Sequence, residues 1–63
     1  MLTAERLRKY LEGLPDMSAT IAEATAALGV GADQIYAAAA GDYWIMTDVY
    51  SDTSEPYVAL EGE

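Results

Sequence analysis

The chain has 63 residues, with eleven acidic side chains, three basic ones and no histidine or cysteine, so its formal net charge is −8. A chain this short forms one domain, residues 1–63, with too little material to enclose a deep active-site cavity. The lack of cysteine excludes disulfides and thiolate metal sites, and the lack of histidine removes the commonest metal ligand and the usual general base. We therefore expect no enzymatic activity, no metal and no cofactor.

The charges are unevenly distributed along the chain. All three bases lie within the first nine residues, and ten of the eleven acids follow them. The first ten residues, MLTAERLRKY, lack the apolar segment of a signal peptide, and the longest uncharged run, 24–32, is too short to span a bilayer. We expect a cytoplasmic protein without a membrane partner.

The first predicted helix covers residues 3–13. Thr3 is the expected N-cap, and Leu2 is placed to pack against Leu7 as a hydrophobic staple. Gly13 and Pro15 should end the helix. The apolar positions follow the spacing of one buried helical face: Leu7, Tyr10, Leu11 and Leu14.

The second predicted helix covers residues 20–28. Thr20 and Glu23 have the spacing of a capping box, in which each side chain bonds the other residue's backbone N–H. Gly29 fits the position after the helix, where a left-handed conformation costs glycine little. The expected inner face consists of Ile21, Ala24, Thr25 and Leu28.

The third predicted helix covers residues 32–40 and ends at Gly41. Ile35 and Ala38 should face the core. The alanine run AAAA, 37–40, favours a helix and presents small side chains, which allow a neighbouring element to approach closely.

The last part of the chain, 43–61, predicts a β-hairpin. YWIMTDVY is rich in aromatic and β-branched residues, PYVAL is a second strand candidate, and SDTSE between them has turn composition. We expect Trp44 and some of the tyrosines to cover the inner face of the hairpin. Tyr36 and Tyr50 are candidates for exposed interface anchors, because tyrosine is enriched at such positions.

The segment IAEATAALGVGADQI resembles a helix-turn-helix motif, with a small residue at Thr25, glycine at position 29 and apolar residues on both sides of the turn. With one helix before it and a hairpin after it, the whole chain resembles a winged helix-turn-helix domain. The resemblance implies an α+β fold with three helices followed by a C-terminal hairpin, the wing. A three-helix bundle with a loosely attached tail is the alternative.

In that family the second motif helix reads bases and the wing contacts the DNA backbone. The groove-facing positions implied by the resemblance are Ala32, Asp33, Gln34, Tyr36, Ala37 and Ala40. This chain departs from the family at these contacts: it carries acids on the motif helix, and Asp52 and Glu55 stand on the wing where such proteins place Arg or Lys. Duplex binding depends on cations that neutralise phosphates, so we expect no direct binding to duplex DNA.

Our leading hypothesis is that the acids imitate phosphates and bind a protein with a basic nucleic-acid-binding groove. The chain is similar in size and charge to viral DNA mimics, including anti-CRISPR and anti-restriction inhibitors, in which case it would act in the host-cell cytoplasm. A fold alone does not fix a function. The candidate partner-binding residues are Glu23, Asp33, Gln34, Tyr36, Asp42, Asp48, Asp52 and Glu55.

Two other functions remain open. One is a dimeric DNA-binding transcriptional regulator whose bases face the duplex, namely Arg6, Arg8 and Lys9. The other is an acidic assembly module from a high-salt organism, with the alanine-rich helix as an oligomer contact; a homodimer fits either one. A calcium site at Asp48, Asp52 and Glu55 is disfavoured, because their spacing lacks the alternating ligands and central glycine of an EF-hand loop.

Overall fold

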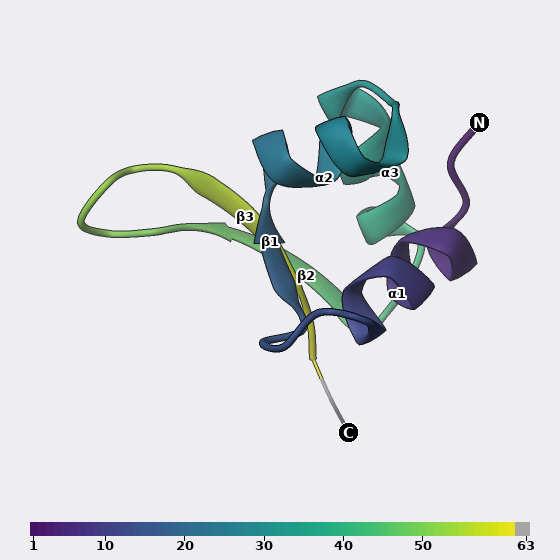
Figure 1. Ribbon diagram of the computed structural model, residues 1–63, viewed down its shortest axis with the longest axis horizontal. Coiled ribbons are helices and arrows are strands. Elements are labelled where there is room, and N and C mark those ends of the chain that lie inside the picture. The colour runs from purple at the N-terminus through teal and green to yellow at the C-terminus, as the bar shows by residue number, and fades with distance from the viewer. Residues whose placement is uncertain (62–63) are drawn as a thin grey trace.

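A computed structural model describes residues 1–61 (Figure 1). In chain order the elements are α1 (Ala4–Glu12), β1 (Ser18–Thr20), α2 (Ile21–Leu28), α3 (Ala32–Ala40), β2 (Ile45–Val49) and β3 (Pro56–Leu60). The strands form one antiparallel sheet in the order β1-β3-β2. The molecule is thus a small α+β protein, as predicted from the sequence. Within the described residues, no helix is long and apolar enough to cross a membrane.

Local capping explains where the helices begin and end. At the start of α1, the hydroxyl of Thr3 accepts the Arg6 N–H at 3.1 Å. At the start of α2, Thr20 and Glu23 form the predicted capping box, with bonds of 3.0 and 3.1 Å. Gly29 ends α2 in the left-handed conformation, with φ 68°, and its N–H donates to the Thr25 carbonyl. These predicted caps are confirmed.

Strand β1 is not predicted by the sequence pattern. β1 lies between α1 and α2 and pairs with β3, with Ser18 opposite Ala59 and Ala19 opposite Val58. The expectation that all strands follow the three helices is therefore wrong. Three residues are too few to show the period-two alternation by which a strand is recognised. This segment is a strand because β3 offers it a free edge and Ala19 adds a buried side chain to the core.

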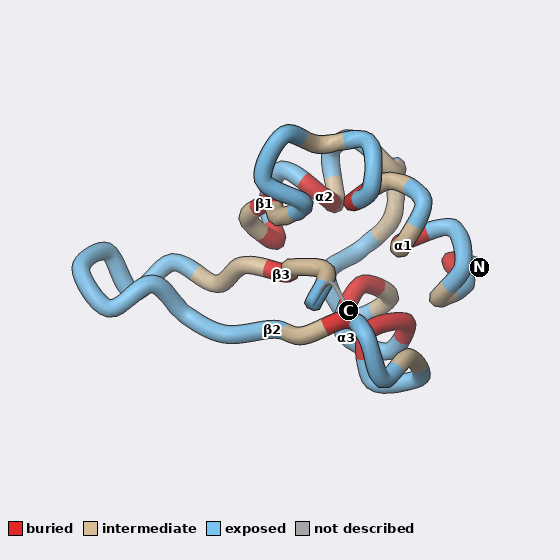
Figure 2. The backbone as a smooth tube through the Cα atoms, turned by 90° about the horizontal axis from the view of Figure 1, so that it is seen from below, coloured by how far each residue is buried: buried red, intermediate tan, exposed pale blue. Residues whose placement is uncertain are grey.

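The sheet has one covered face and one open face. Ala19, Ile45 and Val58 share a face, are buried, and lie toward the helices, which sit on that side of the sheet (Figure 1). The intervening residues Met46 and Ala59 point to the other face and are only partly buried. The core therefore lies between the covered face and the helices, where the buried residues gather in Figure 2.

Buried apolar side chains from the three helices, from β2 and from β3 meet in this core. Ile35 and Ala38 face it from α3, as predicted, and Leu2 packs into it with Leu7. The buried members are Leu2, Leu7, Leu11, Ile21, Ala24, Ile35, Ala38, Ala39, Ile45 and Val58. Thr25 and Leu28 on the expected inner face of α2 are only partly buried.

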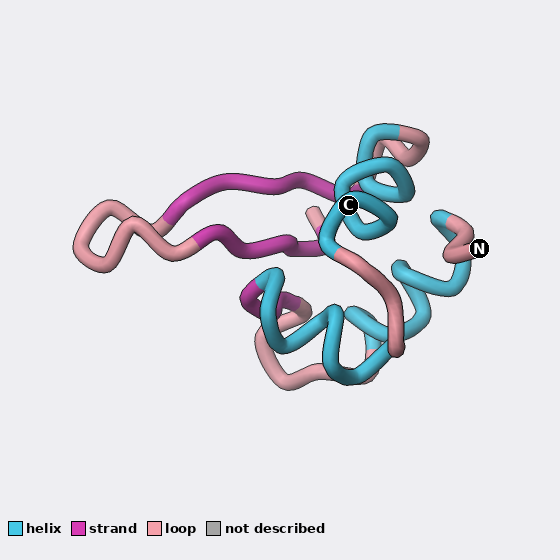
Figure 3. The backbone as a smooth tube through the Cα atoms, turned by 90° about the horizontal axis from the view of Figure 1, so that it is seen from above, coloured by secondary structure: helices cyan, strands magenta, loops and turns pink. Residues whose placement is uncertain are grey.

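Strands β2 and β3 form the predicted hairpin, which extends away from the helices (Figure 3). The Tyr50 N–H donates to the Glu55 carbonyl at 3.0 Å, and the Ser54 N–H returns to the Tyr50 carbonyl at 2.8 Å. These bonds close the turn in the SDTSE segment.

Trp44 does not cover the inner face of the hairpin. Its side chain is 44% exposed and packs edge-on against Tyr43, with ring centroids 5.2 Å apart. The next residue, Ile45, faces the core, and successive side chains alternate between the two faces of a sheet. The expectation that Trp44 covers the inner face is therefore wrong, because the next residue, Ile45, takes that position. Tyr50 is exposed and stacks on Tyr57. Neither ring belongs to the core cluster.

Candidate functional site

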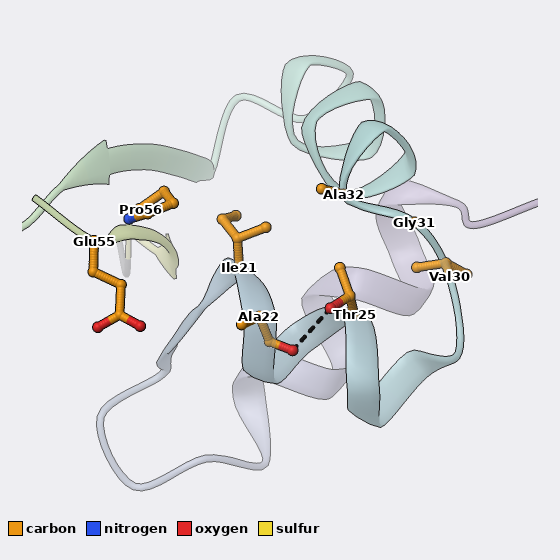
Figure 4. A pocket seen from close by; sticks show the side chains of 8 residues that line it. All are labelled: Ile21, Ala22, Thr25, Val30, Gly31, Ala32, Glu55 and Pro56. Atoms are coloured by element: carbon orange, nitrogen blue, oxygen red, sulfur yellow. Dashed lines mark hydrogen bonds between the residues drawn. The ribbon is translucent and has the colours of Figure 1, made fainter.

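A cleft opens between α2, the start of α3 and the turn end of the hairpin. It has a volume of about 490 Å³. Its lining comes from α2, from the turn before α3 and from the start of β3: Ile21, Ala22, Thr25, Val30, Gly31, Ala32, Glu55 and Pro56 (Figure 4). Three segments that are distant in the sequence thus share one concave surface.

Most of the cleft is apolar. Ile21 is part of the buried core, and in Figure 4 its side chain stands between Pro56 on the hairpin side and Ala32 on the α3 side. The Thr25 hydroxyl donates to the Ala22 carbonyl at 2.8 Å, so its proton is used within α2. Gly31 and Ala32 are small and exposed, which keeps the α3 side of the cleft open.

One of the predicted carboxylates lines this cleft. Glu55 lines it from the hairpin and is exposed. The Asp33 carboxylate lies next to Gly31, with Oδ1 2.7 Å from the position that a Cβ there would occupy, but Asp33 does not line the cleft. Asp33 is in the first turn of α3, where the helix dipole favours a negative charge. The structure therefore places one predicted site residue, Glu55, in the lining of the cleft.

Gln34 has a structural partner instead. Its Oε1 accepts the Leu2 N–H at 2.9 Å, a bond that holds the N-terminal segment against α3. Asp33 and Gln34 also line a second hollow of about 460 Å³, between this segment and α3. Gln34 is partly buried, and its carbonyl oxygen already accepts this bond, which leaves its amide N–H groups and one acceptor lone pair for a partner.

Asp42 is paired within the molecule. Its Oδ2 accepts hydrogen bonds from Arg8, and Nη2 of that arginine lies 2.6 Å away. The Asp42 side chain is only 6% exposed. The Arg8 guanidinium, and next the backbone N–H of Trp44, hold the pKa of Asp42 below its usual value. The hypothesis that Asp42 presents a free charge to a partner therefore does not fit this geometry.

The other three predicted acids are exposed. Glu23 belongs to the α2 capping box. Asp48 accepts the N–H of the next residue, Val49, at 2.8 Å. Asp52 is in the hairpin turn. Each keeps its charge at the surface, although Glu23 and Asp48 also satisfy backbone donors.

The outward side of α3 is accessible. Of the positions that the resemblance places toward a groove, Gln34 is partly buried and the others are exposed, with Tyr36 44% exposed: Ala32, Asp33, Tyr36, Ala37 and Ala40. The buried alanines, 38 and 39, lie on the core side. The alanine run thus serves both faces of the helix, and only its outer members are free for contact with another chain.

Acidic charge dominates this part of the surface. No base follows Lys9 in the sequence, and the Arg8–Asp42 pair is the single salt bridge within residues 1–61. The remaining acids near the cleft and hairpin therefore have no cation beside them. In the described part of the chain, no group of three or more acidic side chains is arranged to hold a metal ion.

The cleft does not follow from the sequence pattern. Ile21 is a core position, as predicted, and the sequence does not mark Ala22, Val30 or Pro56 as site residues. The available signal was the small pair Gly31-Ala32 beside the turn, together with a proline at the start of the last strand, but only the fold shows that these segments meet.

No protein-family model matches the chain, and neither a search of curated proteins nor one of solved structures found a match.

Proposed function

We propose that this protein is a winged-helix domain that binds another protein, occupying a basic groove that otherwise holds nucleic acid. Three features support the winged-helix assignment: the turn at Gly29 between α2 and α3, the exposed outer side of α3, and the hairpin that follows it. β1 adds a third strand to the hairpin.

One observation carries the binding proposal: the surface formed by α2, α3 and the hairpin bears exposed acids and no base. A DNA-reading surface needs cations there, because neutralising phosphates supplies most of the affinity for duplexes. The bases are confined to α1, and Arg8 is paired with Asp42. This arrangement opposes the regulator hypothesis and suits a partner with a basic surface.

The acids in the proposed interface are those that remain exposed. Glu55 lines the cleft, Asp33 lies in the first turn of α3, Asp48 and Asp52 lie along the hairpin, and Glu23 lies at the start of α2. Tyr36 supplies an aromatic anchor on α3. Such charges steer the partner and speed association more than they slow dissociation.

The test is a pull-down from a bacterial lysate with mass spectrometry, followed by competition on the purified partner against labelled DNA. The parent protein should displace the DNA. Asp33→Asn with Asp52→Asn should associate more slowly, with an effect that shrinks at higher salt. A matched control is Glu12→Gln with Asp16→Asn, which removes two exposed charges elsewhere and should change association much less.

Three results would contradict the proposal. They are simultaneous binding of DNA and this protein, equal potency of the parent and the interface variant at low salt, and equal slowing by the control variant. If the acidity is only an adaptation to high salt, no variant loses a partner selectively, and the fold weakens as salt is removed because unscreened acids repel one another.

A further inference from the structure

We propose that the cleft between α2, α3 and the hairpin is an arginine-binding site for a side chain of the partner protein. The aliphatic part of that side chain lies on Ile21, Val30 and Pro56, and its guanidinium pairs with Glu55. This inference rests on the proposed function, because a basic groove supplies the arginine, and it names where the recognition is anchored.

The apolar lining gives the aliphatic part of an arginine a surface to cover. Arginine and lysine bury their methylene stems on apolar surface while the charged end stays near water or a carboxylate. Ile21 forms the buried floor, and Val30 and Pro56 stand on opposite sides of it. Because Gly31 and Ala32 are small, no large side chain from the α3 side fills the space.

Charge complementarity identifies the occupant as a cation. Glu55 is exposed at the cleft, and no cationic side chain forms a salt bridge with it anywhere in residues 1–61. An apolar cleft with one exposed carboxylate in its lining suits a side chain with a long apolar stem and a positive end.

Arginine fits better than lysine for two reasons. Its guanidinium is more weakly hydrated than an ammonium group, so moving it beside an apolar surface costs less. It also donates two parallel hydrogen bonds to one carboxylate. Pro56, with its fixed φ, and the hydrogen bond from Tyr50 to the Glu55 carbonyl hold the Glu55 backbone in place before binding.

The probe is a capped arginine, N-acetyl-arginine N-methylamide, titrated into the whole isotope-labelled protein and followed by NMR of the backbone amides. Saturable shifts should centre on Ala22, Gly31, Ala32 and Glu55. Capped norleucine, which keeps an apolar stem without the charge, should bind about two- to five-fold more weakly, the range expected for one exposed ion pair. Capped lysine should bind with intermediate affinity.

Three variants separate cleft binding from general attraction to an acidic protein. Glu55→Gln should weaken the arginine probe about five-fold, and Ala22→Leu, which fills an exposed cleft position without changing charge, should abolish the saturable shifts. Asp52→Asn removes one charge outside the cleft and should have little effect. Spectra of the free variants show directly whether each one is folded.

The inference is overturned if arginine shifts spread over all the acids, if Glu55→Gln and Asp52→Asn weaken binding alike, or if norleucine binds as well as arginine. This experiment uses no partner protein. Loss of arginine binding while the protein still displaces DNA from its partner would therefore reject the cleft site and leave the proposed function standing. Arginine binding without any DNA displacement would reject the proposed function and leave the cleft site standing.

Discussion

Arg8 on α1 and Asp42 after α3 are joined by two hydrogen bonds, from Nε at 3.2 Å and from Nη2 at 2.6 Å, both to Oδ2. The other carboxylate oxygen of Asp42 accepts the Trp44 N–H at 2.8 Å. One side chain thus ties the first helix to the turn that leads into β2. This explains why an acid predicted to face a partner, and a base available to face DNA, are both used for structure.

Replacing Arg8 should destabilise the fold more than replacing its neighbour Arg6. In Arg8→Met, Asp42 keeps a largely covered carboxylate without its cation. Arg6→Met is the matched control, since it removes the same charge from an exposed position. Thermal melts at neutral pH should show the lower Tm for Arg8→Met. Equal melting temperatures would show that the pair contributes nothing beyond net charge.

The same pair predicts a pH dependence. The pKa of Asp42 is below its usual value of 3.8, first because of the Arg8 hydrogen bond and next because of the Trp44 N–H. A carboxyl with a lower pKa in the folded state stabilises the fold at pH above its unfolded value and loses that contribution as the pH falls through the folded value. The stability difference between the parent and Asp42→Asn should therefore be constant near neutral pH and shrink below about pH 4.

Denaturant unfolding of both proteins across this pH range measures that difference. Using the difference matters because the other acids also titrate, and their loss of charge relieves repulsion in a protein of net charge −8. A difference that stays unchanged down to about pH 2 would show that the Asp42 carboxylate is not the stabilising group.

Among the glycines within residues 1–61, Gly29 is the one with a left-handed backbone conformation. Its φ is 68°, and no atom lies within 4 Å of the place where a Cβ would be, so the cost of substitution is backbone strain and not a clash. Gly29→Val should cost roughly 1–3 kcal/mol. Gly29→Asn should cost less, because asparagine visits this conformation more readily. Ala26→Ser, on the exposed side of α2, should barely change the melting temperature.

Much of the helical half could be predicted because its signals are local. Thr3, Thr20 and Glu23 cap the helices through residues three positions away. Gly29 is favoured by the positive φ of its own position. The hairpin also has local turn chemistry. By contrast, β1 depends on an edge that β3 supplies from 37 to 41 residues later, with Ser18 opposite Ala59 and Thr20 opposite Tyr57. A partner that distant leaves no pattern in three residues.

The sequence also could not predict which residues of the hairpin face the core, or that the cleft exists, for a related reason. In YWIMTDVY, apolar residues occupy both alternating sets of positions, so the pattern leaves open which set faces inward. The choice is made by packing: Ile45, not Trp44, meets the core. The pairing of Asp42 and the cleft at Glu55 likewise depend on tertiary contacts that the sequence does not reveal.

This facing is testable with two neighbouring substitutions. Ile45→Ala removes a buried side chain and should cost roughly 2–5 kcal/mol. Trp44→Ala removes a larger side chain that is 44% exposed, and should cost less than the 3–5 kcal/mol or so that is typical of a buried tryptophan. Urea unfolding should therefore rank Ile45→Ala as the more destabilised variant. The opposite ranking would place Trp44 in the core after all.

The final prediction concerns DNA. The parent protein should not shift a labelled duplex of any sequence at about 0.15 M salt, because the surface of α2, α3 and the hairpin carries exposed acids and no base. Arg6 and Lys9 on α1 are the only bases outside the Arg8–Asp42 pair, and two cations release too few counterions for stable binding against the ten other acids.

The informative control is Asp33→Lys with Asp52→Lys, which changes the net charge from −8 to −4 by adding two units at each site. If the fold is a winged helix, these cations lie where that family contacts DNA, and the variant should gain weak, salt-sensitive binding. Asp16→Lys with Glu12→Lys makes the same change in net charge outside α2, α3 and the hairpin, and this variant should gain less DNA binding. Sub-micromolar binding by the parent would reject mimicry and restore the regulator, and equal gains by the two lysine variants would show that net charge, not the α3 and hairpin surface, governs contact with DNA.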